Sequence, residues 1–261
     1  MPAHPPLPPF PATTAAADAP VQPTVAVVTG AGRRLGREIA IALARRGHSV
    51  LVHHRSSHSA AADLVDELRQ TGVTAAAVQA DFQHPATAAT AVFNAAKDLG
   101  EVRVLINSAA VFNDRTLADI DEHHCTEHLA VNLLAPLFLI RQFAEQLHVS
   151  STGHVLNVLD WRALRPRNGW LVYTAAKAAL AAATKTLALQ LAPRIQVNAI
   201  APGALLPPED RPDWHAQRAS ASIPLQRTGT PQDLIRAVSF LLDSSFITGE
   251  ILHVSGGEEL Q

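Results

Sequence analysis

The sequence predicts an α/β fold, a doubly wound, seven-stranded parallel sheet with helices on both faces. Three observations predict it. From residue 24 onward, strand-like and helix-like segments alternate with hardly a break. The strand-like segments are short continuous apolar runs, which is typical of strands buried on both faces of a parallel sheet. Glycines follow three of the helix-like segments as stops. Strict alternation of this length gives parallel strands joined by right-handed crossovers.

Each element follows from its own residues. The first strand is expected at 24–29, a run rich in β-branched residues, and the helix at 34–46 places apolar residues on one face before Gly47 ends it. The other strands are expected at 49–54, 73–80, 102–107, 153–159, 195–200 and 250–254. The other helices are expected at 60–70, 86–99, 123–147, 170–191 and 231–242. No repeat or linker interrupts residues 24–261, so we expect one domain there.

Composition excludes several classes of protein. Hydrophobic residues make up 48% and the formal charge is −2, so there is no basic field for nucleic acid or an anionic membrane. The longest apolar run, 129–140, is too short to span a bilayer. One cysteine rules out an internal disulfide framework and favours a reducing, cytoplasmic compartment. Neither Cys125 nor the scattered histidines have the spacing of a metal site, so no metal is expected.

The first 23 residues differ in composition from the rest. They are rich in proline, alanine and threonine and contain no lysine or arginine. They lack the charged start and apolar core of a signal peptide. We expect residues 1–23 to be a disordered tail. An arm that binds a partner is the alternative.

A glycine-rich turn joins the first strand to the first helix. Residues 29–36 read TGAGRRLG. Glycines at such a turn let the backbone approach a pyrophosphate, which then sits on the positive N-terminal end of the helix. Its place after the first strand of a β-α-β unit predicts a dinucleotide site of the Rossmann type.

The second strand indicates which dinucleotide binds. NAD sites usually place an acidic residue there for the ribose 2′-hydroxyl, whereas NADP sites need a cation for the 2′-phosphate. The strand ends in HHRS at 53–56, with no carboxylate until Asp63, and Arg33 and Arg34 add positive charge in the loop. The sequence therefore favours NADPH. The alternative is that Arg55 is an ordinary surface residue.

Tyr173 and Lys177 are four residues apart in an alanine-rich helical segment, so they lie on one helix face. A nearby cation favours tyrosinate, so we expect Lys177 to lower the pKa of Tyr173 from about 10. A tyrosine tuned in this way can exchange protons near neutral pH. Such pairs are common by chance, so the interpretation depends on the other motifs.

Taken in order, these motifs resemble the short-chain dehydrogenase/reductase family over residues 24–261. Further counterparts are Asp81 after the third strand, the run NSAA at 107–110, Asn132 in the long helix, and the run NAIAPG at 198–203. The resemblance implies NADPH contacts at Gly30, Arg33, Arg34, Leu35, His54, Arg55, Ser56, Asp81, Phe82, Asn107, Ser108, Ala109, Tyr173, Lys177, Pro202 and Gly203. It also implies a homotetramer, because family members commonly assemble through two long helices.

Two departures from the family pattern are informative. Arg34 stands where the loop normally has glycine, and Asp160 stands where a catalytic serine normally precedes the tyrosine by thirteen residues. No serine or threonine lies between His154 and Val172 to replace it. Both departures are found together in the pteridine reductases and the related dihydromonapterin and dihydrofolate reductases. The chain resembles this subgroup also in Phe112.

The resemblance implies NADPH-dependent reduction of a dihydropteridine, of the dihydromonapterin, dihydrobiopterin or dihydrofolate type, to its tetrahydro form. We expect four catalytic residues. Asp160 accepts hydrogen bonds from the pterin and works with Tyr173 in proton delivery, Lys177 holds the nicotinamide ribose, and Asn132 keeps a water relay to Lys177.

The small-molecule pteridine is expected to contact Arg34, Phe112, Asp160, Tyr173, Leu205 and Trp214. Phe112 would stack on the flat heterocycle, and its alternative role is that of a core phenylalanine. Residues 204–225 are expected to form a lid, in which Trp214 either contacts substrate or packs the lid down.

Two other functions remain open. The first is a carbonyl or 3-oxoacyl reductase that has lost its serine. The second is a protein that senses NADPH without turnover and uses the tail as its partner-binding arm. Retention of Asn132, Tyr173 and Lys177 argues against a sensor, which has no use for a proton relay.

Overall fold

A computed structural model describes residues 24–207 and 223–261 of the chain. The expected tail at 1–23, most of the expected lid and Trp214 lie outside these ranges. One seven-stranded sheet carries the fold, with all neighbouring strands parallel and in the order β3-β2-β1-β4-β5-β6-β7. The doubly wound α/β fold predicted from the sequence is confirmed.

The strands are β1 Val25–Val28, β2 Ser49–His54, β3 Ala75–Gln79, β4 Val102–Asn107, β5 Gly153–Val158, β6 Ile195–Pro202 and β7 Ile251–Val254. The α-helices are α1 Arg34–Arg45, α2 His58–Gln70, α3 Pro85–Ala96, α4 Glu122–Leu129, α5 Ala135–Gln146, α6 Leu171–Leu191 and α8 Pro231–Asp243. Short 3₁₀ turns lie between or after these elements, at Lys97–Leu99, Trp161–Ala163 and Glu258–Leu260.

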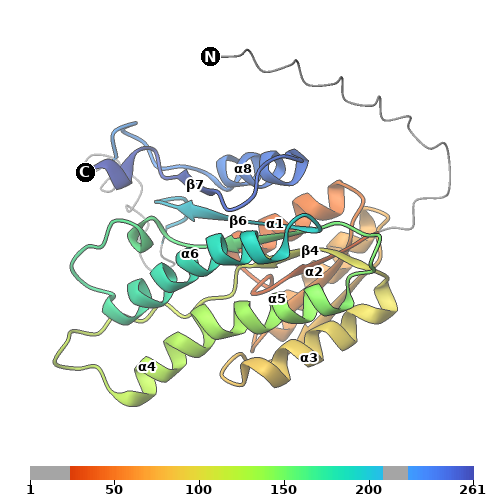
Figure 1. The fold of residues 1–261 in the computed structure, drawn as a ribbon, viewed down its shortest axis with the longest axis horizontal. Coiled ribbons are helices and arrows are strands. Elements are labelled where there is room, and N and C mark those ends of the chain that lie inside the picture. The colour runs from red at the N-terminus through yellow and green to blue at the C-terminus, as the bar shows by residue number, and fades with distance from the viewer. Residues whose placement is uncertain (1–23, 208–222) are drawn as a thin grey trace, which may run out of the picture.

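The helices form two layers because the side chains of a strand point alternately to opposite faces of a sheet. In β1, Ala26 and Val28 pack with residues of α1, α2 and α8, whereas Val25 and Val27 pack with residues of α3 and α5. All four residues of β1 are buried. Figure 1 shows α3, α5 and α6 on one side of the sheet and α8 on the other.

The long helix expected at 123–147 is interrupted. A π-helical turn, η2 Ala130–Leu134, separates α4 from α5 and contains Asn132. Pro136 follows within the first turn of α5, where the lack of a backbone N–H is tolerated. A π turn holds one residue more than an α turn, so it changes which way the side chains on either side of it point.

The strand order reverses at β1, which has β2 on one side and β4 on the other. The helices that follow these two strands, α1 after β1 and α5 after β4, therefore pack on opposite faces of the sheet. Ligands of open α/β sheets bind at such a point.

Candidate functional site

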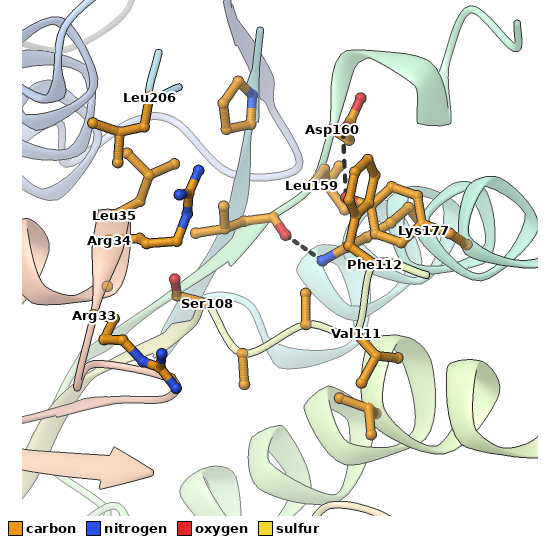
Figure 2. Close-up of a pocket in the computed structure, with 18 of the residues that line it drawn as sticks. Arg33, Arg34, Leu35, Ser108, Val111, Phe112, Leu159, Asp160, Lys177 and Leu206 are labelled. Carbon is orange, nitrogen blue, oxygen red and sulfur yellow. Dashed lines mark hydrogen bonds between the residues drawn. The ribbon is translucent and has the colours of Figure 1, made fainter. Parts of the chain in front are cut away.

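A cavity of about 1090 Å³ opens at the carboxyl ends of the strands. Sixteen of the predicted site residues line it: Gly30, Arg33, Arg34, Leu35, His54, Arg55, Ser56, Phe82, Ser108, Ala109, Phe112, Asp160, Tyr173, Lys177, Pro202 and Gly203. Figure 2 shows Arg33 and Arg34 at one end of the cavity, and Phe112, Asp160 and Lys177 at the other. The cavity thus has one end rich in cations and one end rich in aromatic and proton-exchanging groups.

The glycine-rich turn lies against the segment after β4. Gly30 has φ +64°, and a Cβ atom added to it would lie 2.8 Å from Ala109 Cα. The hydroxyl of Thr29 accepts hydrogen bonds from the backbone N–H groups of Ser108, at 2.9 Å, and Ala109, at 3.0 Å. The close approach therefore requires glycine at position 30, and Thr29 holds the two segments together.

His53, which the sequence reasoning did not assign to the site, joins the ends of three strands. Its Nδ1 accepts a hydrogen bond from Gly30 N at 3.1 Å, so its Nε2, 3.1 Å from Ala80 O, carries the proton and donates. The ring stacks on Phe82 with 4.1 Å between centroids. Burial lowers the pKa of His53 to about 4, so the ring is neutral at physiological pH, as this hydrogen-bond pattern requires. The strand pattern gave no indication that this side chain crosses between loops.

The predicted cofactor contacts at the cationic end differ in their surroundings. Arg34 has φ +54°, a left-handed conformation in the position where glycine was expected, and its Nη1 donates to Pro207 O at 3.1 Å. Arg55 lies 3.4 Å from Glu127 and stays half exposed. Asp81 does not line the cavity, and its carboxylate accepts from Gln83 N at 3.0 Å.

Tyr173 and Lys177 lie near Asp160 at the other end of the cavity. The Tyr173 hydroxyl donates to Asp160 Oδ2 at 3.4 Å. Lys177 Nζ donates to Val158 O at 2.7 Å, and its ammonium lies 5.9 Å from the centre of the Tyr173 ring. Lys177 is fully buried, and burial lowers its pKa to about 8 although Asp160 acts in the opposite direction.

The predicted lowering of the Tyr173 pKa is wrong for this arrangement. Burial disfavours tyrosinate, and the negative charge of Asp160 adds to that effect, so the pKa of Tyr173 lies well above its ordinary value of 10. The cation of Lys177 is directed at a backbone carbonyl instead of the phenol. Spacing on the helix placed the two residues on one face but could not reveal the burial.

Asn132 holds the segment after β4 in place. Its Oδ1 accepts from Val111 N at 3.1 Å and its Nδ2 donates to Val111 O at 3.0 Å. The same amide lies 3.3 Å from Nδ1 of His128, which is buried. Asn107 likewise braces the strands, because its Nδ2 donates to Asn157 at 2.8 Å. Neither Asn107 nor Asn132 lines the cavity, so both act on it through the backbone that they hold.

Phe112, Trp170 and Tyr173 form an aromatic wall of the cavity. Its ring stacks on Trp170 at 5.4 Å and meets Tyr173 edge-on at 4.7 Å, and it remains 48% exposed, which excludes the alternative of a core phenylalanine. Trp170 has φ +50°, and Asp114 accepts from its backbone N–H at 2.6 Å. The wall therefore depends on a strained residue held by a carboxylate.

Arg162 also lines the cavity and contacts Asp160. It was not among the site residues predicted from the sequence. Its guanidinium lies 4.9 Å from the centre of the Trp161 ring and 5.0 Å from that of Trp170. Its Nη1 is 3.3 Å from each Asp160 carboxylate oxygen. The one indication in the sequence that Arg162 could belong to the site was its position two residues after Asp160.

The segment after β6 also needs correction. Leu205, expected to contact substrate, is 3% exposed and packs in the core, and Leu206 lines the cavity instead. Glu258 lines the cavity near Gly203 and accepts from Ala204 N at 3.2 Å. Trp214 lies outside the described residues.

The cavity can accommodate a nicotinamide dinucleotide. The turn at Gly30 brings backbone close to its floor, the N-terminus of α1 faces it, and Arg33, Arg34 and Arg55 provide positive charge for phosphates. The acceptor of Asp160 and the donor of Tyr173 lie side by side at the far end. Such a pair can bind a ring N–H and pass a proton to a neighbouring atom.

Comparison with known proteins identifies the family of the chain. The model of the family described as short chain dehydrogenase matches residues 24–217. This chain belongs to the short-chain dehydrogenases. It is thus an oxidoreductase.

Relatives of this short-chain dehydrogenase differ in their described activity. An uncharacterized oxidoreductase of Methylorubrum extorquens is 34% identical over 243 residues, covering 89% of this chain and 96% of the relative. A 3-oxoacyl-[acyl-carrier-protein] reductase of Staphylococcus epidermidis is 32% identical over 237 residues, covering 89% and 97%. The structure of FolM alternative dihydrofolate reductase 1 from Brucella canis, complexed with NADP, matches with a TM-score of 0.87 and 33% identity, covering 92% of this chain and 96% of that one.

Among the residues that the structure describes, no three His, Cys, Asp or Glu side chains gather as a metal site would require. No helix within 24–207 or 223–261 is both long and apolar enough to cross a membrane.

Proposed function

We propose that this enzyme reduces a dihydropteridine to its tetrahydro form with NADPH. The observation that carries the proposal is the contact between Asp160 and Tyr173, 3.4 Å apart, beside the buried Lys177. A carboxylate offers acceptors to a substrate, and a pteridine ring has N–H and amino donors to meet them. The ketone of an ordinary reductase substrate has only an acceptor, which the carboxylate would repel.

NADPH would lie along the cavity with its phosphates near Gly30 and the N-terminus of α1. Arg33, Arg34 and Arg55 would hold the 2′-phosphate and the remaining phosphates, and His54, Ser56 and Phe82 would surround the adenine end. When bound, this cofactor supplies a hydride to the adjoining substrate. The proposed ribose contact of Lys177 requires its ammonium to share or exchange the bond to Val158 O.

The residues of the chain would then supply the proton. Asp160 binds the N–H donors of the pteridine, and Tyr173 stands ready to donate from its hydroxyl to a ring nitrogen. Its raised pKa keeps the phenol protonated at physiological pH, so the hydroxyl is present as a hydrogen-bond donor to that nitrogen. Phe112 and Trp170 would cover one face of the flat ring and exclude water.

Known proteins of the family support both this function and one alternative. The Brucella structure with NADP is described as a dihydrofolate reductase, whereas the Staphylococcus relative is described as a 3-oxoacyl reductase. The second function is favoured by this relative and by relatives from Staphylococcus aureus with the same description. Asp160 argues against it, because a carboxylate cannot donate the hydrogen bond that a serine gives to a carbonyl oxygen.

A steady-state assay of NADPH oxidation tests the proposal, with dihydrobiopterin, dihydromonapterin, dihydrofolate and an acetoacetyl thioester as substrates. We expect turnover of at least one pteridine, its loss in Asp160→Ala, and a preference for NADPH over NADH. Turnover of the thioester alone, increased in Asp160→Ser, would establish the oxoacyl reductase instead. Tight NADPH binding without turnover of any compound would establish the sensor.

Assembly and compartment stay predictions. Leu129 and Leu134, near the centre of the α4–α5 unit, are each 40% exposed, and Leu189 on α6 is 84% exposed. These helices are the ones through which the resemblance implies a homotetramer. Light scattering after gel filtration checks it, because a mass near the 27.8 kDa of one chain would contradict it.

A further inference from the structure

Asp160 and Arg162 project from one short turn at the substrate end of the cavity. The carboxylate of Asp160 caps the 3₁₀ turn Trp161–Ala163 by accepting from Arg162 N at 2.8 Å. Nη1 of Arg162 then returns to both carboxylate oxygens at 3.3 Å. One residue, Arg162, therefore contacts the Asp160 carboxylate both through its backbone N–H and through its guanidinium.

We propose that Arg162 is a positioning residue that holds the Asp160 carboxylate toward the substrate and so makes the site selective for ring N–H donors over carbonyl acceptors. This inference rests on the proposed pteridine reduction. A carboxylate that is free to rotate would not select between the two kinds of substrate. The inference therefore assigns the selectivity to Arg162, which holds the carboxylate.

Arg162 differs from the surface arginines of the chain in how it is held. The side chains of Arg162 and Asp160 are only 18% and 14% exposed. Indole rings lie on either side in sequence, and each is about 5 Å from the guanidinium carbon. A guanidinium over the face of an indole is attracted by the ring quadrupole. The guanidinium is thereby restricted before any substrate arrives.

One atom of this arrangement shows that its geometry is imposed. Nε of Arg162 is buried and has no hydrogen-bond partner among the residues that the structure describes. An unpaired buried donor is costly because it has lost its hydrogen bonds to water. The rotamer is therefore selected by the indole contacts and the carboxylate, which compensate for that cost.

The charges around Asp160 determine what it can accept. Arg162 faces it from its own turn, Tyr173 and Lys177 face it from α6, and Glu258 lines the same cavity. Arg162 and Tyr173 each take up acceptor positions of the carboxylate, and Asp160 also lines the cavity in which the substrate would bind. A fixed negative acceptor attracts N–H groups and repels a carbonyl oxygen.

The test compares Arg162→Met, which removes the charge at similar length, with Arg162→Lys, which keeps it. Arg165→Met is the matched control, because Arg165 is exposed, does not line the cavity, and donates from Nε to Glu259 O at 2.9 Å. Three quantities are measured. They are the Kd for NADPH, kcat/KM for the best pteridine, and the ratio of this kcat/KM to the kcat/KM for the acetoacetyl thioester.

We expect Arg162→Met to bind NADPH as the wild type does but to lose at least tenfold in kcat/KM for the pteridine. The ratio of kcat/KM for the pteridine to kcat/KM for the thioester should fall, because a carboxylate that is free to rotate no longer favours N–H donors over a carbonyl. Arg162→Lys should restore that ratio. A role in folding alone would lower the amount of active protein without changing the ratio.

Each outcome decides one claim. An active wild type together with unchanged selectivity in Arg162→Met overturns the inference and leaves the proposed function standing. A wild type that turns over no pteridine overturns both. If Arg162→Met fails to fold, Arg162→Gln is measured in its place, and the same comparison of selectivity with Arg162→Lys decides.

Discussion

The Tyr173 hydroxyl donates to Asp160 Oδ2 at 3.4 Å, across thirteen residues of sequence and from a different element. This contact couples the proton donor of the proposed reaction to its substrate acceptor. It also contributes to the raised pKa of Tyr173, for which burial is the larger cause. Replacing the carboxylate charge should therefore be visible in the ionisation of the phenol.

Tyr173 is the single tyrosine of the chain, so the ultraviolet absorbance of tyrosinate reports on this site alone. We predict that Asp160→Asn ionises its tyrosine at lower pH than the wild type, because the amide removes a negative charge but keeps the shape. Spectrophotometric titration to high pH, with circular dichroism to verify folding, measures the difference. Equal or reversed midpoints would show that the charge of Asp160 does not act on the phenol.

Lys177→Met should stabilise the folded chain at pH 7 while abolishing turnover. The unfolded chain holds the lysine proton up to about 10.5, whereas the folded chain releases it at about 8. Below pH 8 the full cost of burying the charge is present, and between 8 and 10.5 the unfolded state binds more protons, so the cost diminishes as pH rises.

We expect a gain of about 2 kcal/mol in the free energy of unfolding at pH 7, after allowance for the lost hydrogen bond to Val158 O. The gain should shrink toward pH 10.5. Urea unfolding at several pH values checks both statements, and Lys185→Met on the exposed side of α6 is the control. Destabilisation of Lys177→Met at every pH would contradict the argument.

Gly30→Ala should weaken NADPH binding at least tenfold. The new Cβ would lie 2.8 Å from Ala109 Cα, so the turn and the segment after β4 would have to separate. Gly47→Ala is the matched control, because Gly47 also has positive φ, +87°, but no atom of the described residues lies within 4 Å of the added Cβ. It should lose about 1 kcal/mol of stability and keep its affinity. Fluorescence titration with NADPH compares them, and equal losses of affinity would implicate backbone strain alone.

Arg55→Ala should reduce the preference for NADPH over NADH about tenfold, since it removes a cation proposed to face the 2′-phosphate. Its present partner, Glu127 at 3.4 Å, is a weak competitor because Arg55 is half exposed. Arg141→Ala removes an arginine of similar exposure that pairs with Glu145 on α5. The ratio of kcat/KM for the two cofactors is the measurement. Unchanged ratios in both variants would assign the preference to Arg33 and Arg34.

Much of the fold was predictable because its signals are local. Apolar runs and glycine stops placed every described strand and helix within a few residues of its observed position. The π turn at Ala130–Leu134 was not predictable, since its residues continue the same apolar helical pattern. Its presence depends on contacts such as that of Asn132 with Val111, which come from a separate segment.

The cofactor end of the cavity was likewise predictable, because its residues are adjacent in sequence along single turns. The substrate end was less so. Arg162 acquires its position from Trp161 and Trp170, and Trp170 is itself held at φ +50° by Asp114, fifty-six residues away. The pKa of Tyr173 was predicted in the wrong direction because residue spacing gives proximity to Lys177 but gives neither burial nor the carboxylate of Asp160.

The π turn makes the site sensitive to the length of the chain as well as to its composition. Because the π turn holds about one residue more than an α turn, deleting one of its residues other than Asn132 would allow α4 and α5 to form one regular helix with little rotation of either flank. The change would fall on the turn itself, where the Asn132 amide would lose its present direction toward Val111. A single-codon deletion here would leave every catalytic side chain encoded and still dismantle the segment that carries Phe112.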